Sequence, residues 1–325
     1  MTDDNAFKRK ARKHQQATGD SYMRARRQVD VNHANTNAAA PTNTLLTLLA
    51  EPTTEALRIP LGLQADGTPV WLDLRDEADG GNGPHGLIVG TTGSGKTTAL
   101  TSLTFALCTR YSPEQVQFIL ADPRKHSGFD DFADYPHVRA TFTDLERVED
   151  AATTLVDTIR GVLDERARTL HDLRRTGSPF DTIGDYQRGH TEPSADPTAL
   201  PFIFVVVDDL SALCRHRPDV ADSLTALTRK GRALGVHLVA STATIGHPLP
   251  RDLFDNLVFR ITLRTTTEAE SRRMIGTPAA AHLPSDRRGV GWITAAPGAN
   301  PLQFTGFHPS RSVITAASRR SATGQ

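Results

Sequence analysis

Residues 90–97 constrain this chain more than any other segment, because they spell GTTGSGKT, a complete phosphate-binding P-loop. A short apolar run at 85–89 precedes the motif, and residues 98–109 follow it with leucines at helical spacing. This motif requires a strand before the loop and a helix after it, so the setting disfavours a glycine-rich surface turn. We therefore expect nucleotide phosphates to be bound by Gly90, Thr91, Thr92, Gly93, Ser94, Gly95, Lys96 and Thr97, with Thr98 in the first turn of the helix.

The lysine of the motif is notable because the chain contains 31 arginines and only six lysines. A compact ammonium fits between β- and γ-phosphate oxygens, whereas a guanidinium presents a rigid planar fork. Lys96 is therefore predicted to bridge these two phosphates, and the hydroxyl of Thr97 is predicted to bind Mg²⁺. The loop does not distinguish ATP from GTP, but the sequence shows no NKxD-type guanine-binding segment, which favours ATP. The expected cofactors are ATP and Mg²⁺.

Two adjacent acidic residues, Asp208 and Asp209, follow the most apolar segment of the chain, residues 202–207. A P-loop enzyme needs a carboxylate at the end of a buried strand, where it can hold the magnesium shell. Asp208 is predicted to hold Mg²⁺ directly or through water, and Asp209 to orient or deprotonate the attacking water. Capping of a following helix is the alternative role for this pair. Asp122, after the apolar run 116–120, is a second candidate because active-site groups lie at the carboxyl ends of strands.

An arginine from a neighbouring subunit often completes the charge around a γ-phosphate. Arg229 and Arg232 follow a predicted helix and precede a predicted strand, so both are candidates for this catalytic role. Ordinary surface cations are an equally weighted alternative, because arginine is frequent in this chain and charged side chains are mostly exposed.

Apolar strands alternate with helices after the P-loop, which predicts an α/β fold with a mostly parallel central sheet flanked by helices. A β-hairpin is expected before it, because the turn signal at residues 65–67 separates two strand-like runs. The predicted strands are 57–61, 70–74, 85–89, 116–120, 202–207, 236–240, 256–263, 291–294 and 302–307. Helices are expected at 98–109, at 143–175 after a capping box, and at 221–232, with a surface loop at 187–201.

Composition divides the chain into three parts. Residues 1–50 combine a basic stretch with an Asn/Ala/Thr-rich stretch without a period, which predicts a disordered basic tail. A solvated tail and an arm that binds DNA or an anionic membrane surface are both compatible with this composition. Residues 51–310 are expected to form one ATPase domain, and residues 311–325 a loose C-terminal tail.

The whole-chain properties limit the class of protein. Lys and Arg together number 37, as do Asp and Glu, so no global field attracts nucleic acid, although a local pore can still be basic. The two cysteines lie far apart without a CxxC motif, which suits a reducing cytosol. The longest strongly apolar run, 202–207, is far shorter than the ~20 residues that span a bilayer, and the N-terminus resembles no secretory signal. We therefore expect a cytoplasmic protein without a membrane span of its own, with recruitment to the inner face of the plasma membrane left open.

Several segments outside the P-loop share one family pattern over residues 57–309. They are GPHGLIVG (83–90), YSPEQVQF (111–118), YPHV (135–138), GRALGVHL (231–238), ITLRT (261–265), ESR (270–272), IGTP (275–278) and HLP (282–284). In order and spacing they resemble the FtsK/SpoIIIE-type motor ATPases, and among these the EccC-like ATPases of type VII secretion. The segment Asp122-Pro123-Arg124 is instead similar to the DPK segment of the DNA-translocating branch, where EccC-like proteins usually carry DFKGG.

This resemblance implies a RecA-like P-loop domain with ATP bound between subunits. Such a domain forms a homo-oligomeric ring or stack, or docks on a larger ATPase of the same type. The likeness favours translocation of a polypeptide by type VII secretion. DNA translocation or conjugative DNA transfer is one alternative, and a non-hydrolysing ATP-binding subunit that regulates a ring is another.

Two departures from the family pattern bear on hydrolysis. The family's acidic pair is usually Asp-Glu; Asp209 is one methylene shorter, which withdraws its carboxylate by about 1 Å and can slow the reaction on the order of 10²-fold. Thr242 stands where the family has a glutamine that senses the γ-phosphate, and Ala243 replaces an arginine. A threonine hydroxyl is shorter, so we expect it to need a bridging water. The sequence therefore predicts ATP binding with slow hydrolysis.

Overall fold

The structure is a computed structural model, and it describes residues 40–52, 57–124, 128–145, 149–189, 200–246, 249–294 and 299–323. Within these residues the strands are β1 (Arg58–Leu63), β2 (Pro69–Asp73), β3 (Gly86–Val89), β4 (Val116–Ala121), β5 (Val138–Phe142), β6 (Phe202–Val207), β7 (Val236–Thr242), β8 (Phe259–Thr262), β9 (Val290–Thr294) and β10 (Leu302–Gly306). All of them belong to one sheet, in the order β2-β1-β10-β9-β8-β3-β7-β6-β4-β5.

The sheet is parallel through its centre and antiparallel at one side. Strands β8, β3, β7, β6, β4 and β5 pair in parallel. Strands β9, β10, β1 and β2 continue the sheet with antiparallel pairing, and β9 joins it to β8. The predicted α/β class, the mostly parallel sheet and the β1–β2 hairpin are therefore confirmed, with Gly67 at a left-handed φ of 87° in the hairpin turn.

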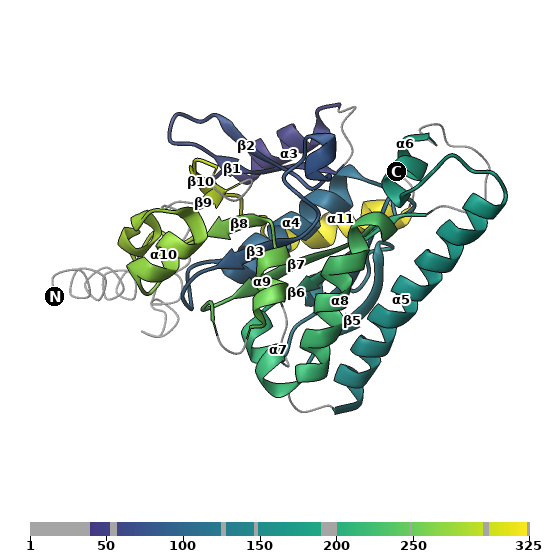
Figure 1. Cartoon of the computed structure of the whole chain (residues 1–325). Helices are drawn as coiled ribbons and strands as arrows, with labels where there is room; N and C mark the ends of the chain where they lie inside the picture. Colours follow the sequence, from purple (N-terminus) through teal and green to yellow (C-terminus); the bar gives the residue numbers. More distant parts are fainter. Residues whose placement is uncertain are drawn as a thin grey trace.

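Helices cover both faces of the sheet (Figure 1). The helices are α3 (Thr42–Ala50), α4 (Lys96–Arg110), α5 (Glu149–Arg175), α6 (Ile183–Gly189), α7 (Leu210–His216), α8 (Pro218–Leu234), α9 (Arg251–Asn256), α10 (Glu268–Ile275) and α11 (Arg311–Thr323), with 3₁₀ turns η1 (Glu77–Asp79), η2 (Asp130–Phe132) and η3 (Ala279–His282). Figure 1 shows α5, α8 and α9 together over one face. Among the described helices, none combines the length and the apolar character needed to cross a bilayer.

Strand β6 shows why the sheet has a core on each face. Its run of aromatic and β-branched residues is buried along its length, as expected for a central parallel strand. Ile203 and Val205 point into the core that α5, α7 and α8 cover, whereas Phe204 and Val206 belong to the core beneath α3, α4 and α11. Because β3, β4, β6 and β7 are parallel, their carboxyl ends meet at one edge of the sheet.

Both predicted tails need correction where the structure describes them. Residues 42–50 form α3, whose Leu45, Leu48 and Leu49 are buried against the rest of the domain, at the i, i+3, i+4 spacing of one helix face. Residues 311–323 form α11, and the hydroxyl of Tyr135 donates to the carbonyl of Ile314 at 2.7 Å. The folded unit therefore extends at least from residue 40 to residue 323, beyond the predicted limits of 51 and 310. The prediction for residues 1–39 lies outside the described residues.

Three element predictions also differ from the structure. The predicted helix start at 143 is wrong, because Asp144 has a left-handed φ of 57° that no helix adopts; residues 146–148 lie outside the described residues, and α5 is described from Glu149. Strand β5 was not predicted, since it lies at the sheet edge with one face exposed and carries no continuous apolar run. Residues 187–189 of the predicted 187–201 loop belong to α6, and residues 190–199 lie outside the described residues.

Candidate nucleotide-binding site

The P-loop connects β3 to α4 at the carboxyl edge of the sheet. Gly93 and Gly95 have φ values of 79° and 108°, in the left-handed region that favours glycine. A Cβ at Gly90 would lie 2.6 Å from the hydroxyl of Ser94, so this position also excludes a side chain. The first N–H groups of α4 have no intrahelical acceptor and carry partial positive charge. The loop is therefore shaped to hold a polyphosphate, which fits the predicted nucleotide.

Lys96 is the first residue of α4, and its side chain folds back over the loop. Its Nζ donates to the carbonyl oxygens of Gly90 at 2.8 Å and Thr91 at 3.2 Å. Burial lowers the pKa of Lys96, and the carboxylates of Asp208 and Asp209 oppose that shift. A half-buried ammonium beside two carboxylates can transfer its hydrogen bonds from carbonyl oxygens to phosphate oxygens.

Thr97 and Asp208, the two predicted magnesium-binding residues, are in direct contact. The Thr97 hydroxyl donates to Asp208 Oδ2 at 2.6 Å, and the Ser241 hydroxyl donates to Asp208 Oδ1. Asp208 follows β6, and Ser241 lies in the neighbouring β7, so adjacent strand ends hold the carboxylate in place. A hydroxyl and a carboxylate are oxygen ligands of the type that Mg²⁺ prefers, so the donor set fits the metal.

Asp209 both caps helix α7 and lines the cleft next to the P-loop. Its backbone is left-handed (φ 58°, ψ 60°), its N–H donates to the Ser241 hydroxyl at 3.1 Å, and its Oδ1 accepts from the N–H of Ala212 at 3.3 Å. It therefore caps α7, which is the alternative role considered for the acidic pair. The same residue lines the cleft beside Lys96 and Thr97.

The cleft has a volume of about 940 Å³ and runs from the P-loop to the antiparallel side of the sheet. Ser285, Asp286, Arg288 and Gly289 line it next to the loop, and the N–H of Gly289 donates to the carbonyl of Ser94 at 2.9 Å. The far end is lined by residues of β1, α4 and β10 and the segment after β10: Ile59, Pro60, Leu61, Ser102, Leu103, Phe304, Gly306, Phe307 and His308. One end is charged and the other largely apolar, as a nucleotide with its phosphates and base requires.

Residues 49–250 match the model of the FtsK/SpoIIIE family, which is more than half of the chain. The chain belongs to the FtsK/SpoIIIE family. It is 35% identical over 258 residues to the ESX-3 secretion system protein EccC3 of Mycobacterium tuberculosis, a match that covers 77% of this chain and 19% of EccC3. It is 37% identical over 233 residues to the ESX secretion system protein EccC of Thermomonospora curvata, covering 72% and 17%.

A solved structure also resembles this FtsK/SpoIIIE domain. The cytoplasmic domain of the T. curvata type VII secretion ATPase EccC superimposes with a TM-score of 0.74 and 32% identity, covering 88% of this chain and 34% of that one. The chain spans less than a fifth of the length of the two secretion proteins it matches. The fold and the EccC-like character of the ATPase domain, both predicted from the sequence, are thus confirmed.

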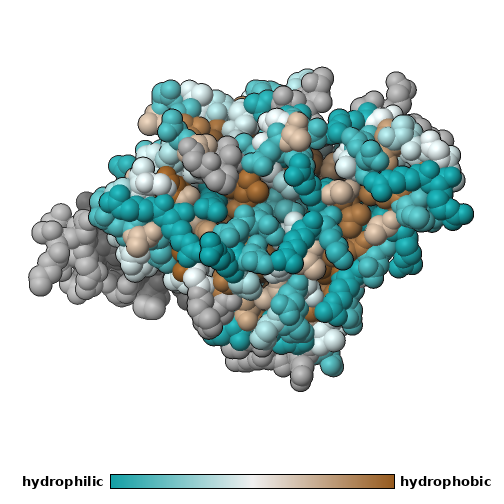
Figure 2. Space-filling view, viewed as in Figure 1, coloured by the Kyte–Doolittle hydropathy of each residue, from teal (hydrophilic) through white to brown (hydrophobic). Residues whose placement is uncertain are grey.

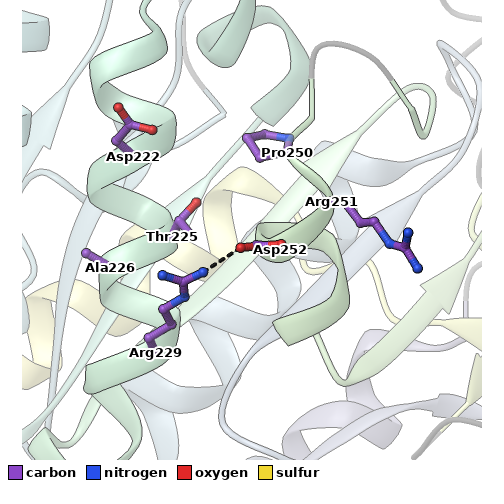
Figure 3. Close-up of a pocket in the computed structure, with 7 residues that line it drawn as sticks. All are labelled: Asp222, Thr225, Ala226, Arg229, Pro250, Arg251 and Asp252. Atoms are coloured by element: carbon purple, nitrogen blue, oxygen red, sulfur yellow. Dashed lines mark hydrogen bonds and ion pairs between the residues drawn. The ribbon is translucent and has the colours of Figure 1, made fainter.

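The two candidate arginines of this FtsK/SpoIIIE domain lie on α8, away from the P-loop of the same chain. Arg232 pairs with Asp76, which precedes β3, so the pair lies at the amino edge of the sheet, opposite the loop. Arg229 points across a groove of about 400 Å³ towards Asp252 of α9 and forms an ion pair with it (Figure 3). A contact with a γ-phosphate would therefore have to be made with the nucleotide of a second subunit.

Thr242 and Ala243 differ in how they reach the site. The Thr242 hydroxyl is fully buried, shares a hydrogen bond with the Ser211 hydroxyl and donates to the carbonyl of Thr244 at 2.9 Å. Its carbonyl accepts from the N–H of Gly90 at 3.2 Å, which fixes the start of the P-loop. Ala243 lines the cleft, whereas the Thr242 side chain is directed towards α7, so the structure gives Thr242 a supporting position.

Sequence reasoning missed the importance of Arg124. It was noted as the third residue of Asp122-Pro123-Arg124, but the structure places its guanidinium on both Asp122 and Asp208 and in the lining of the cleft. Hydrogen bonding to the Asp122 carboxylate raises the pKa of Arg124. The usable signal was its spacing of two residues from an aspartate at the end of a buried strand. The cleft segment 285–289 gave no comparable signal.

Proposed function

We propose that this domain binds ATP with Mg²⁺ in the cleft and hydrolyses it slowly. The observation that carries the proposal is the contact between Thr97 and Asp208 directly beneath the P-loop. Bound Mg²⁺ supplies positive charge to the β- and γ-phosphates. Thr97 and Asp208 would hold it, and Lys96 would exchange its two carbonyl acceptors for phosphate oxygens.

Within this proposal the remaining residues have distinct tasks. The backbone N–H groups of residues 90–95 surround the phosphates, and Gly90, Gly93 and Gly95 place no side chain in the way. Asp209 orients the attacking water and accepts its proton, with one oxygen held by the N–H of Ala212. Pro60, Phe304 and His308 form the end of the cleft that suits the base. Arg229 or Arg232 reaches the γ-phosphate of a neighbouring subunit in a ring or stack.

The proposed cargo is a polypeptide exported by type VII secretion. Two EccC proteins of ESX secretion systems, at 35% and 37% identity, support this assignment. DNA was the alternative for two reasons: Asp122-Pro123-Arg124 resembles the DPK segment of DNA translocases, and the N-terminal stretch, which lies outside the described residues, is basic. In this chain Arg124 of that segment lines the nucleotide cleft and pairs with the buried Asp122, so the segment's chemistry concerns the nucleotide and gives DNA no separate support. We further propose that the domain works in the cytoplasm, as a homo-oligomer or docked on a larger EccC-type ATPase.

Nucleotide binding tests the central proposal. Replacing Lys96 by alanine removes charge-assisted hydrogen bonds worth about 1.5–3 kcal/mol, so ATP affinity should fall about tenfold to a hundredfold. Lys230→Ala is the matched control, since Lys230 is an exposed lysine of α8 away from the loop. Calorimetric titration with ATP and GTP measures both the loss of affinity in the variant and the preference of the protein for adenine or guanine. Equal affinities for the wild type and Lys96→Ala would disprove the proposed site.

Cargo is tested separately from nucleotide. The ATP-bound protein should bind a peptide that carries a type VII secretion signal and should show no binding to duplex DNA at low salt, where phosphate contacts are strongest. Fluorescence anisotropy with labelled peptide and labelled duplex measures both. Tight DNA binding with a steep salt dependence would replace the secretion proposal by DNA translocation.

A further inference from the structure

Arg124 places a guanidinium between the two buried carboxylates at the carboxyl edge of the sheet. Its Nη2 donates to Asp208 Oδ2 and, at 2.8 Å, to Asp122 Oδ2, while its Nε donates to Asp122 Oδ1 at 2.9 Å. The same Nη2 lies 3.5 Å from the hydroxyl of Thr97. Arg124 therefore contacts both residues that are expected to hold magnesium.

Asp122 anchors this arginine. The Asp122 side chain is 0% exposed, and it accepts from the backbone N–H of Arg124 at 2.9 Å as well as from the guanidinium. The N–H of Asp122 donates to the carbonyl of Phe142 at 2.9 Å, which fixes the end of β4 against β5. A buried carboxylate is strongly destabilising without a cationic partner, so Asp122 requires Arg124.

Asp208 is the carboxylate for which two cations compete. Its Oδ2 already accepts from Thr97 and Arg124, and its Oδ1 accepts from Ser241. A magnesium ion on Thr97, or a water of its shell, would approach the same Oδ2. The Arg124 side chain is 51% exposed, so it can move towards the cleft, whereas Asp208 is buried and held by its neighbours.

We propose that Arg124 is a built-in cation of the magnesium site and a phosphate-binding residue in cis. This inference rests on the proposed nucleotide binding. The guanidinium holds Asp208 in position, releases Oδ2 when the metal arrives with the nucleotide, and remains anchored on Asp122 at the wall of the cleft. There the N–H groups that it releases from Asp208 are available to phosphate oxygens in the cleft. Arginine suits this task because its fork can keep one carboxylate while it exchanges the other for a phosphate oxygen.

The proposal predicts two effects of opposite sign for Arg124→Gln. Without magnesium, the wild type keeps the Arg124 guanidinium near the phosphates in addition to Lys96, so the variant should bind ATP about tenfold more weakly in EDTA. With nucleotide present, magnesium no longer competes with the guanidinium, so the variant should need about tenfold less Mg²⁺ for half-maximal effect. If Arg124 had only a structural role, Arg124→Gln would weaken both the ATP affinity in EDTA and the response to Mg²⁺.

The experiment is a fluorescence titration with an N-methylanthraniloyl derivative of ATP, first in EDTA and then across Mg²⁺ concentrations. Arg251→Gln, an exposed arginine of α9, is the matched control and should match the wild type. Arg124→Lys keeps the charge without the fork, so it should recover part of the affinity in EDTA. Because Arg124→Gln leaves Asp122 buried without its cation, the double variant Asp122→Asn/Arg124→Gln is measured beside it, with circular dichroism as the check on folding.

The outcomes separate this inference from the function on which it rests. A weaker affinity in EDTA together with a lower Mg²⁺ requirement, in either variant that folds, supports the inference. Unchanged values, or a loss in both measurements in the folded double variant, overturn it while nucleotide binding stands. Failure of the wild type to bind the ATP derivative under every condition overturns the proposed function, and this inference with it.

Discussion

Replacing Asp209 by glutamate is expected to accelerate ATP hydrolysis. The Asp209 carboxylate lines the cleft beside Lys96 and Thr97, and one oxygen is held by the N–H of Ala212 at 3.3 Å. An added methylene advances the carboxylate by about 1 Å, a displacement that changes rates on the order of 10²-fold. We therefore expect kcat to rise about tenfold to a hundredfold, with little change in KM because Lys96 and Thr97 are untouched.

The same substitution should also lower the free energy of unfolding, by an amount that can be worked out from the backbone and the cap at Asp209. Loss of the α7 cap costs about 1 kcal/mol, and a glutamate at the left-handed φ of 58° adds about 1 kcal/mol of strain. The sum of about 2 kcal/mol is well below the ~5–15 kcal/mol of a typical domain. The variant should therefore fold, with a slightly lower melting temperature.

Phosphate release at saturating ATP and Mg²⁺ measures the rate, and thermal unfolding of the same samples measures the fold. Asp209→Asn is the matched control, because asparagine keeps the shape and the cap but accepts no proton. Its rate should fall to background at unchanged stability. Background turnover in both the wild type and Asp209→Glu, with the nucleotide bound and the fold intact, would refute this reasoning and leave a non-hydrolysing ATP-binding subunit.

Three further predictions concern the fold and the loop. Leu45→Ala removes a fully buried side chain of α3 and should reduce the free energy of unfolding in urea by about 2–5 kcal/mol. Thr47→Ala on the exposed face should change it by less than about 0.5 kcal/mol, and equal effects of the two substitutions would contradict α3 as part of the domain. Gly90→Ala places a Cβ 2.6 Å from the Ser94 hydroxyl and 2.9 Å from Leu263 Cβ, so ATP affinity should fall at least about tenfold in calorimetry; retained affinity would contradict the loop geometry. Burial lowers the pKa of His85 to about 4, so the unfolded state binds its proton first as the pH falls. This group alone should remove about 3 kcal/mol of stability between pH 6.5 and 4. Urea unfolding across this range should therefore show a smaller loss in His85→Asn than in the wild type, and equal losses would contradict the assignment.

The features that the sequence predicted correctly are those with a strong local pattern. The P-loop is specified by glycines that the backbone requires, and β6 by an uninterrupted run of aromatic and β-branched residues. Asp208 was predicted from these two patterns together, because a P-loop enzyme needs a carboxylate at the carboxyl end of a buried strand to hold the magnesium shell. Each of these patterns is complete within a few consecutive residues, so each could be identified without knowledge of the packing.

The features that it did not predict depend on contacts between distant segments. Helix α3 adjoins an Asn/Ala/Thr-rich stretch, and its three leucines become part of the core only through their packing against α4 and β1. The role of Arg124 depends on Asp208, 84 positions away along the chain. Gly289 is brought to the P-loop by β9, which no spacing in the sequence indicates.

A short series of backbone hydrogen bonds connects the P-loop to Ala40, the first residue that the structure describes. Ser94 accepts from Gly289 at 2.9 Å, Gly289 accepts from Gly306 at 2.9 Å, and Gly306 accepts from Ala40 at 3.2 Å. Mechanical tension applied at Ala40 would therefore act on β10, which is two hydrogen bonds from the phosphate loop. We expect tension applied at Ala40 to alter how long the nucleotide stays bound, and nucleotide dwell times measured under tension in an optical trap would test this.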